Sequence, residues 1–131
     1  MRGRGVLLAV ALVLATTVLG EEARGPRIRV EPESFDFGKV LPDRTLRKEF
    51  RLRNLGDEAL VIERISKSCG CTAAATEVST LAPGESTPLR VTVETRTASG
   101  TIEHEVLVQS NDSKTPTLKI RLRATVVTET R

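Results

Sequence analysis

From residue 28 onward, apolar and polar positions alternate with a period of two along most of the chain. Proline, glycine, asparagine or aspartate interrupts the alternation about every ten residues, a spacing typical of short strands joined by turns. The expected strands cover residues 28–30, 34–40, 46–53, 59–65, 89–93, 101–109 and 117–127, with a weakly patterned piece at 73–81. The sequence therefore predicts an all-β, immunoglobulin-like antiparallel β-sandwich of about seven strands.

Two features of the early strands allow finer predictions. Pro32 separates residues 28–30 from 34–40, which favours one edge strand broken in two, because proline is tolerated at sheet edges. Leu60, Val61 and Ile62 form a continuous apolar run, which predicts burial on both faces near the start of the third strand.

The last two expected strands carry opposite charges on their outward faces. If they pair as an antiparallel hairpin, Glu105 lies opposite Arg121 and Glu103 lies opposite Arg123. The row Lys119, Arg121 and Arg123 is alternatively a docking stripe for an acidic partner. Cross-strand neutralisation explains the row without a partner, and this is the interpretation that we adopt.

The first twenty residues have the layout of a signal peptide. Arg2 and Arg4 precede an apolar run over residues 6–19. At about 1.5 Å per helical residue the run covers roughly 21 Å, less than the roughly 30 Å hydrocarbon core of a membrane. We therefore expect an exported, periplasmic or extracellular protein with no stable membrane anchor after cleavage. The expected divisions are a signal peptide at 1–20, a flexible segment at 21–27 and the immunoglobulin-like domain at 28–128.

Charge and composition exclude one class of partner. Without Arg2 and Arg4, the chain holds 18 lysines and arginines against 17 aspartates and glutamates. It contains neither tryptophan nor tyrosine, so the aromatic platforms on which bases stack are scarce. Nucleic-acid binding, which needs a basic face, is therefore not expected.

The two cysteines of the chain, Cys69 and Cys71, are separated only by Gly70. Along a straight strand their Cα atoms would lie roughly 6.5 to 7 Å apart, so the chain must bend to bring the sulfurs together. Gly70 is expected to be the hinge, because glycine adopts positive φ without steric cost. Export would place the pair in an oxidising compartment, so a local disulfide is the favoured interpretation. The alternatives are a redox-active pair, a soft-metal site and two free thiols.

A third metal ligand is available in His104, the one histidine of the chain. Two thiolates with an imidazole suit Cu(I), whereas a closed zinc site needs four ligands. The interpretation that we favour places His104 at the edge of the core, in phase with Ile102 and Val106, with its ring bonded to a carbonyl oxygen. No resident metal or other cofactor is therefore predicted.

The sequence offers no set of catalytic residues. With one histidine and no recognisable nucleophile motif, only the cysteine pair could support catalysis, so no enzymatic activity is predicted. Asn111-Asp112-Ser113 matches a glycosylation sequon. The same residues also suit an ordinary turn between strands, and we favour the turn.

Several segments of the chain resemble, in their order, the bacterial domain-of-unknown-function family 1573. They are FDFGKV at 35–40, FRLRNLGDEALVI at 50–62, SCGCT at 68–72, Pro83-Gly84-Glu85 and Ser110-Asn111-Asp112. The resemblance covers nearly all of the mature chain. It implies an immunoglobulin-like fold in an extracytoplasmic bacterial setting, similar to hydin-type and major-sperm-protein-like domains, which act chiefly as scaffolds and binding modules. The resemblance implies no activity.

The leading hypothesis is therefore an exported binding or scaffold module of the bacterial cell envelope, whose partner is an unidentified protein or envelope component. Neither a monomer nor an oligomer is favoured. The alternative hypothesis is a thiol-based redox or copper-binding protein that uses Cys69 and Cys71.

Overall fold

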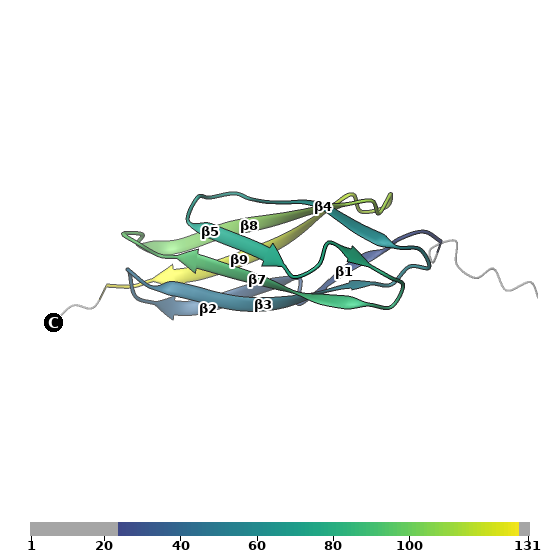
Figure 1. The fold of residues 1–131 in the computed structure, drawn as a ribbon. Coiled ribbons are helices and arrows are strands. Elements are labelled where there is room, and N and C mark those ends of the chain that lie inside the picture. Colours follow the sequence, from purple (N-terminus) through teal and green to yellow (C-terminus); the bar gives the residue numbers. More distant parts are fainter. Residues whose placement is uncertain (1–23, 129–131) are drawn as a thin grey trace, which may run out of the picture.

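The computed structural model describes residues 24–128, which form nine β-strands and no helix (Figure 1). The strands are β1 (Ile28–Glu31), β2 (Ser34–Val40), β3 (Thr45–Asn54), β4 (Leu60–Lys67), β5 (Thr72–Thr76), β6 (Thr80–Leu81), β7 (Ser86–Glu94), β8 (Gly100–Ser110) and β9 (Thr117–Val126). One sheet has the order β1-β3-β7-β5 and the other has the order β2-β9-β8-β4-β6. The predicted immunoglobulin-like β-sandwich is confirmed, with nine strands in place of about seven.

The additional strands arise where the alternation was interrupted. Residues 28–30 and 34–40 are not one broken edge strand, because β1 pairs with β3 in one sheet and β2 pairs with β9 in the other. The chain changes sheets at Pro32, which has no N–H to continue the ladder of β1. The weakly patterned piece at 73–81 contributes to β5 and supplies β6.

One strand pair departs from the predicted antiparallel arrangement. β2 runs parallel to β9, with Ser34 opposite Arg121 and Val40 opposite Val126. Parallel neighbours need a long connection, and here the whole domain between β2 and β9 supplies it. The second sheet is therefore mixed.

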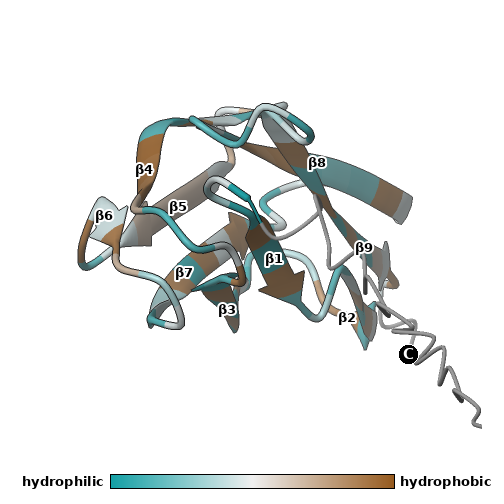
Figure 2. Ribbon diagram, turned by 90° about the vertical axis from the view of Figure 1, so that its right-hand side faces the viewer, coloured by the Kyte–Doolittle hydropathy of each residue, from teal (hydrophilic) through white to brown (hydrophobic). Residues whose placement is uncertain are grey.

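The core lies between the inward faces of the two sheets, where apolar residues form brown bands across the strands in Figure 2. Fully buried side chains of the four-stranded sheet face those of the five-stranded sheet. They include Phe50, Leu52, Leu89 and Val91 on one side and Leu60, Val106, Val108 and Ile120 on the other. Burying each such side chain stabilises the fold by about 1.5–3 kcal/mol.

The start of β4 does not follow the prediction of burial on both faces. Leu60 and Ile62 are buried, whereas Val61 between them is 37% exposed. Successive side chains of a strand point to opposite faces, and this sheet is covered on its inner face only. The prediction for Val61 is wrong because the outer face of β4 meets solvent.

The β8–β9 hairpin has the predicted register, with Glu105 opposite Arg121 and Glu103 opposite Arg123. Arg121 lies 3.7 Å from Glu105, and Arg123 donates a hydrogen bond of 2.6 Å to Glu103. That hydrogen bond and the negative charge of Glu103 raise the pKa of Arg123. Arg121 and Arg123, two of the three members of the basic row, are thus neutralised within the sheet, which supports cross-strand neutralisation as the explanation of the row.

A buried asparagine organises the turn that follows β3. Asn54 is 0% exposed, and its side-chain oxygen accepts hydrogen bonds from the backbone N–H groups of Gly56 (2.9 Å) and Arg27 (3.2 Å). Its amide nitrogen donates to the carbonyls of Glu58 (2.7 Å) and Leu81 (3.0 Å). Both polar atoms of the amide are therefore satisfied by backbone groups from separate segments.

A buried aspartate has the same function in the β8–β9 loop. Asp112 is 1% exposed and accepts hydrogen bonds from the backbone N–H groups of Ile28 (2.9 Å), Lys114 (2.9 Å) and Thr115 (3.2 Å). The carboxylate thereby joins the loop to the first residue of β1. Backbone donors are strong partners for a buried carboxylate.

The neighbouring residue Asn111 connects this loop to β4. Its side-chain oxygen accepts a hydrogen bond from Val61 N (2.8 Å), and its amide nitrogen donates to Ala59 O (3.2 Å). The favoured interpretation of Asn111-Asp112-Ser113 as a turn between strands agrees with these bonds.

Within the described residues, no helix has the length and apolar character needed to cross a membrane. The predicted signal peptide at 1–20 lies outside those residues, so export and cleavage stay predictions. Of the segment at 21–27, Gly25 donates a hydrogen bond of 2.6 Å to the Asp57 carboxylate.

Candidate functional site

The Cys-Gly-Cys element lies between β4 and β5, where the chain passes from the five-stranded to the four-stranded sheet. We refer to residues 68–72 as the cysteine corner. On one side, Ser68 N donates to Glu105 O (3.0 Å), and Glu105 N donates to the Ser68 hydroxyl (2.9 Å). On the other side, Glu94 N donates to Cys71 O (2.9 Å). The corner is therefore attached to β8 and β7 by hydrogen bonds that involve no sulfur.

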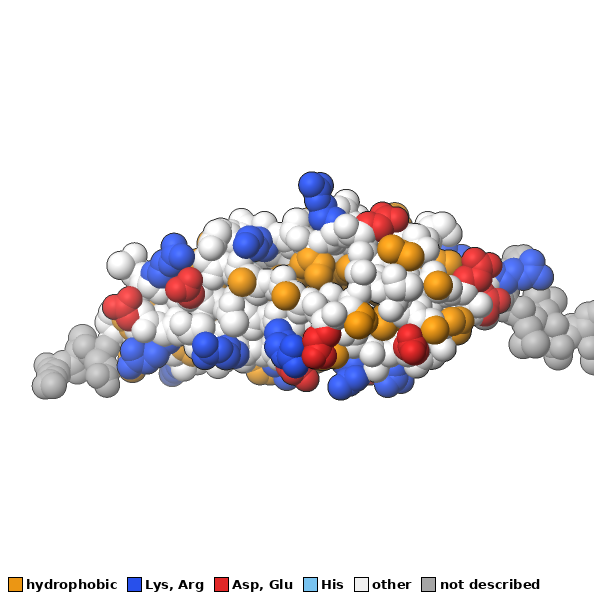
Figure 3. Space-filling view, in the orientation of Figure 1, with side chains coloured by type: hydrophobic (Ala, Val, Ile, Leu, Met, Phe, Trp, Pro, Cys, Tyr) orange, Lys and Arg blue, Asp and Glu red, His pale blue; other side chains and the backbone are white. Residues whose placement is uncertain are grey.

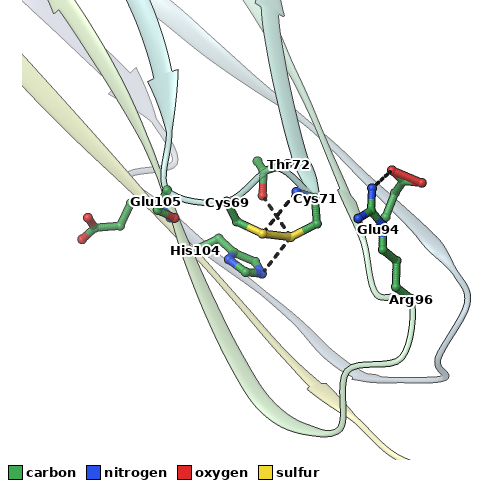
Figure 4. The surroundings of a disulfide bond; sticks show 8 residues. Cys69, Cys71, Thr72, Glu94, Arg96, His104 and Glu105 are labelled. Atoms are coloured by element: carbon green, nitrogen blue, oxygen red, sulfur yellow. Dashed lines mark hydrogen bonds and ion pairs between the residues drawn. A yellow bond between two sulfur atoms is a disulfide. The ribbon is translucent and has the colours of Figure 1, made fainter.

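Cys69 and Cys71 form a disulfide in this corner (Figure 4). Their Cα atoms lie 5.2 Å apart, closer than the roughly 6.5 Å of a straight strand, so the expected bend is present. The turn is closed by a hydrogen bond from Thr72 N to Cys69 O (3.1 Å). The Cys71 N–H also points at the Cys69 sulfur, 3.1 Å away.

Gly70 does not make this bend in the predicted way. Its φ is not positive, although four other glycines in the described residues have positive φ. A Cβ atom added at Gly70 would meet no atom within 4 Å. The prediction of a left-handed hinge is wrong, because a turn with ordinary φ angles already brings the cysteines together.

His104 lies on the inward side of β8, directly beneath the disulfide in Figure 4. Its Nε2 atom is 3.6 Å from the Cys71 sulfur, and the expected carbonyl partner is replaced by this contact with sulfur. Both cysteines and His104 are half-buried. The two sulfurs and the imidazole nitrogen all lie within 4.8 Å of one another. The structure thus brings together all three residues of the metal site that was predicted as an alternative.

A groove of about 730 Å³ runs beside the corner across β2, β9 and β8. Its lining includes Ser68 and His104 together with the two cross-strand ion pairs of the hairpin. Asp36 of β2 and Phe35 complete part of its wall. Four of its five charged side chains form the two cross-strand ion pairs, and Asp36 leaves the lining with one net negative charge.

Sequence reasoning did not identify the edge strand that follows the corner. β5 contains three consecutive alanines, and this run neither alternates in polarity nor carries a charge. The signal in the sequence was the absence of charge and proline over 72–76, a rare property for a strand at a sheet edge.

Solved structures share this fold at low sequence identity. A protein of unknown function from Porphyromonas gingivalis W83 is 20% identical with a TM-score of 0.71, and the match covers 79% of this chain and 48% of that protein. The chain thus corresponds to about half of its length. PapD-like domain 7 of human CEP192 is 13% identical with a TM-score of 0.64, over 95% of this chain and all (100%) of that domain.

A third structure is SSP-19, described as an MSP-domain protein like family member in Caenorhabditis elegans. It is 18% identical with a TM-score of 0.55, over 74% of this chain and 98% of that protein. These matches agree with the predicted likeness to major-sperm-protein-like domains. Among curated proteins, no sequence matches this chain.

The strongest sequence comparison is with a protein family. The family described as "Protein of unknown function (DUF1573)" matches residues 28–126, which include all nine strands and the cysteine corner. This chain therefore belongs to the DUF1573 family, as the resemblance of its motifs implied.

Proposed function

We propose that this protein is an exported immunoglobulin-like binding module of the bacterial cell envelope, and that it binds an extended protein segment along the free edge of β5. The observation that carries the proposal is the chemistry of this edge. β5 is the last strand of its sheet and pairs with β7 on one side only. An open strand edge is a template for the addition of another strand.

The other three sheet edges are protected against such pairing. β1 carries Arg29 and Glu31 and is followed directly by Pro32. β2 carries Asp36 and Lys39, with a register irregularity between them. β6 has only two residues. Charges, prolines, bulges and short length are the devices that prevent edge pairing, and β5 has none of the first three.

The backbone of β5 provides hydrogen-bonding groups in the required direction. Cys71 O accepts a hydrogen bond from Glu94 N, which fixes the phase of the β5–β7 ladder. In an antiparallel ladder, directly opposed pairs are bonded alternately. Ala73 and Ala75 are therefore bonded to β7, and the N–H and C=O groups of Ala74 and Thr76 point to the open side.

Apolar surface continues beyond the end of β5. Val78, in the connection to β6, is 47% exposed, and Val61 is 37% exposed. Val61 is paired with Thr80, two residues after Val78. Figure 3 shows apolar side chains gathered on this face, beyond the end of β5. A partner strand on β5 would have apolar contacts there in addition to its backbone hydrogen bonds.

Two observations support an extracytoplasmic location. The first twenty residues have the layout of a signal peptide. The cysteine pair is joined as a disulfide, a bond that persists in oxidising compartments. The closed disulfide also gives less support to the alternative of a thiol-based redox or metal-binding protein, since neither sulfur is a free thiol in this structure.

The proposal is tested by blocking the edge without disturbing the sheet. Ala74→Pro removes an outward N–H and retains the bonds of the ladder to β7. Ala75→Ser, which leaves every backbone group in place, is the matched control. Full-length wild-type protein and both variants are immobilised and exposed to envelope extract, and the captured proteins are identified by mass spectrometry.

We expect at least one captured protein to be lost with Ala74→Pro and retained with Ala75→Ser. With that protein purified, the amides of Ala74 and Thr76 should exchange hydrogen at least about tenfold more slowly in the complex. Equal capture by both variants would overturn the proposal, as would a strictly monomeric protein that captures nothing.

A further inference from the structure

We infer that the reduced form of the cysteine corner is a Cu(I) site, with Cys69 Sγ, Cys71 Sγ and His104 Nε2 as its ligands. In the oxidised protein the disulfide prevents metal binding, because both sulfur ligands are bonded to each other. The ligands of this site precede β5 or lie on β8, so none of them belongs to the strand edge proposed above for partner binding.

The positions of the ligand atoms fit a small metal ion. Metal–sulfur and metal–nitrogen bonds of about 2.0–2.3 Å place neighbouring ligand atoms roughly 3.5–4 Å apart. The Cys71 sulfur is already 3.6 Å from His104 Nε2. All three atoms lie within 4.8 Å of one another. Once the disulfide opens, the two sulfurs separate by rotation of the cysteine side chains to reach this spacing.

The backbone around the site is held independently of the disulfide. Reciprocal hydrogen bonds between Ser68 and Glu105 attach one side of the corner to the strand that carries His104. The bond from Glu94 N to Cys71 O attaches the other side to β7. Reduction therefore frees the sulfurs without releasing the corner, so the ligands stay preorganised.

The chemistry requires a reductant, which we take to be a dithiol. Two electrons and two protons pass from the dithiol to the S–S bond, giving two thiols here and a disulfide in the reductant. Cu(I) then replaces the two thiol protons, which are released to solvent. The neutral imidazole donates its Nε2 lone pair, so its remaining proton sits on Nδ1.

The ligand set favours Cu(I) over zinc. Soft thiolates select Cu(I), which is stable with fewer ligands than the tetrahedral zinc ion needs. Among the described residues, the group that gathers around the sulfurs contains His104 and no carboxylate. Glu105 points away from the sulfurs in Figure 4. A closed zinc site therefore lacks its fourth protein ligand.

The test titrates Cu(I) into full-length protein under anaerobic conditions, before and after reduction with a phosphine, in competition with a chromophoric Cu(I) chelator. We expect one Cu(I) per reduced chain, no binding to the oxidised chain, and an X-ray absorption spectrum with two sulfurs and one nitrogen at the metal. His104→Gln should weaken binding at least about tenfold while leaving both thiols reactive. Glu103→Gln, a change beside His104 on the opposite face of β8, should leave binding unchanged.

Several results would overturn the inference. Equal affinity of His104→Gln and wild type would remove the imidazole from the site. Binding of Cu(I) by the oxidised protein would show that the disulfide does not prevent metal binding. Retention of zinc rather than copper from an equimolar mixture would contradict the assignment of the ion. Circular dichroism of each reduced variant establishes that a loss of binding is not a loss of fold.

Discussion

Two kinds of strand connection can be compared in this molecule. The turns around Asn54 and Asp112 and the corner around Cys69 and Cys71 differ in the burial of their side chains and in the partners of those side chains. Asn54 and Asp112 are 0% and 1% exposed, and backbone groups satisfy their side chains. The cysteines are half-buried, and their corner is attached through backbone hydrogen bonds and the Ser68 hydroxyl, without the sulfurs. The side chains of Asn54 and Asp112 are therefore needed for the fold, whereas the sulfurs of Cys69 and Cys71 are available for chemistry.

The largest effect that separates the two regions is expected at Asn54. Asn54→Ala leaves the N–H groups of Arg27 and Gly56 and the carbonyls of Glu58 and Leu81 without their side-chain partner. The free energy of unfolding should fall by about 3 kcal/mol, measured by urea unfolding with circular dichroism.

The control for this variant is Asn111→Ala. Asn111 also makes two backbone contacts through its amide, but it is exposed, so water replaces the lost partners. The expected loss is about 1 kcal/mol. Equal losses at the two asparagines would show that burial does not separate them.

A smaller effect is expected from the glycines of the two regions. In Gly56→Ala the new Cβ would overlap the carbonyl oxygen of Gly25 and lie 2.7 Å from Arg27 N. The free energy of unfolding should fall by about 2 kcal/mol. Gly70→Ala meets no atom within 4 Å and needs no positive φ, so its effect should stay within about 0.5 kcal/mol. Thermal or urea unfolding of both variants checks the pair, and a large loss at Gly70 would contradict this account of the corner.

Removal of both sulfurs should cost still less than the loss of the Asn54 amide. The loop that the disulfide closes is so short that its chain-entropy stabilisation is at most about 1.6 kcal/mol. The double variant Cys69→Ser with Cys71→Ser should therefore remain folded, with a change in unfolding free energy no larger than this value. If the double variant failed to fold, the disulfide would be required for folding, which would contradict this prediction.

The smallest effect is expected on the outer face of the β8–β9 hairpin. The raised pKa of Arg123 means that its pairing with Glu103 stabilises the folded state below the ordinary titration range of arginine and is lost only as the pH rises through the raised value. Arg123→Gln should therefore lower the unfolding midpoint slightly and equally at about pH 6 and pH 9. The difference should disappear at about 1 M salt, because the pair is exposed. A pH-dependent difference in that range would implicate another group.

Much of the fold follows from local pattern. The outward charges of Glu103, Glu105, Arg121 and Arg123 were sufficient to predict the register of the hairpin, because cross-strand pairs are set by sequence spacing. The change of sheet at Pro32 was missed, since period-two alternation does not specify which sheet a strand joins. Val61 was misassigned for a related reason, because an apolar side chain can face solvent when its sheet is uncovered on that side.

The residues of the candidate site could be predicted from the sequence, but their arrangement in space could not. Cys69, Cys71 and His104 were candidates as the two cysteines and the one histidine of the chain. Their proximity depends on hydrogen bonds between the corner and β8, and such tertiary contacts leave no periodic signal. The turn at Gly70 was misjudged because the Thr72–Cys69 hydrogen bond closes it without a left-handed residue.

The parallel pairing of β2 with β9 has a consequence for how the chain acquires its structure. The second sheet takes an edge strand from near the start of the domain and places it beside the last strand to be synthesised. Contacts so distant in sequence are slow to form, because a long loop must be closed first. During vectorial emergence from a ribosome or a translocation channel, β2 has no partner until β9 has appeared. The domain therefore completes its fold only after β9 has emerged.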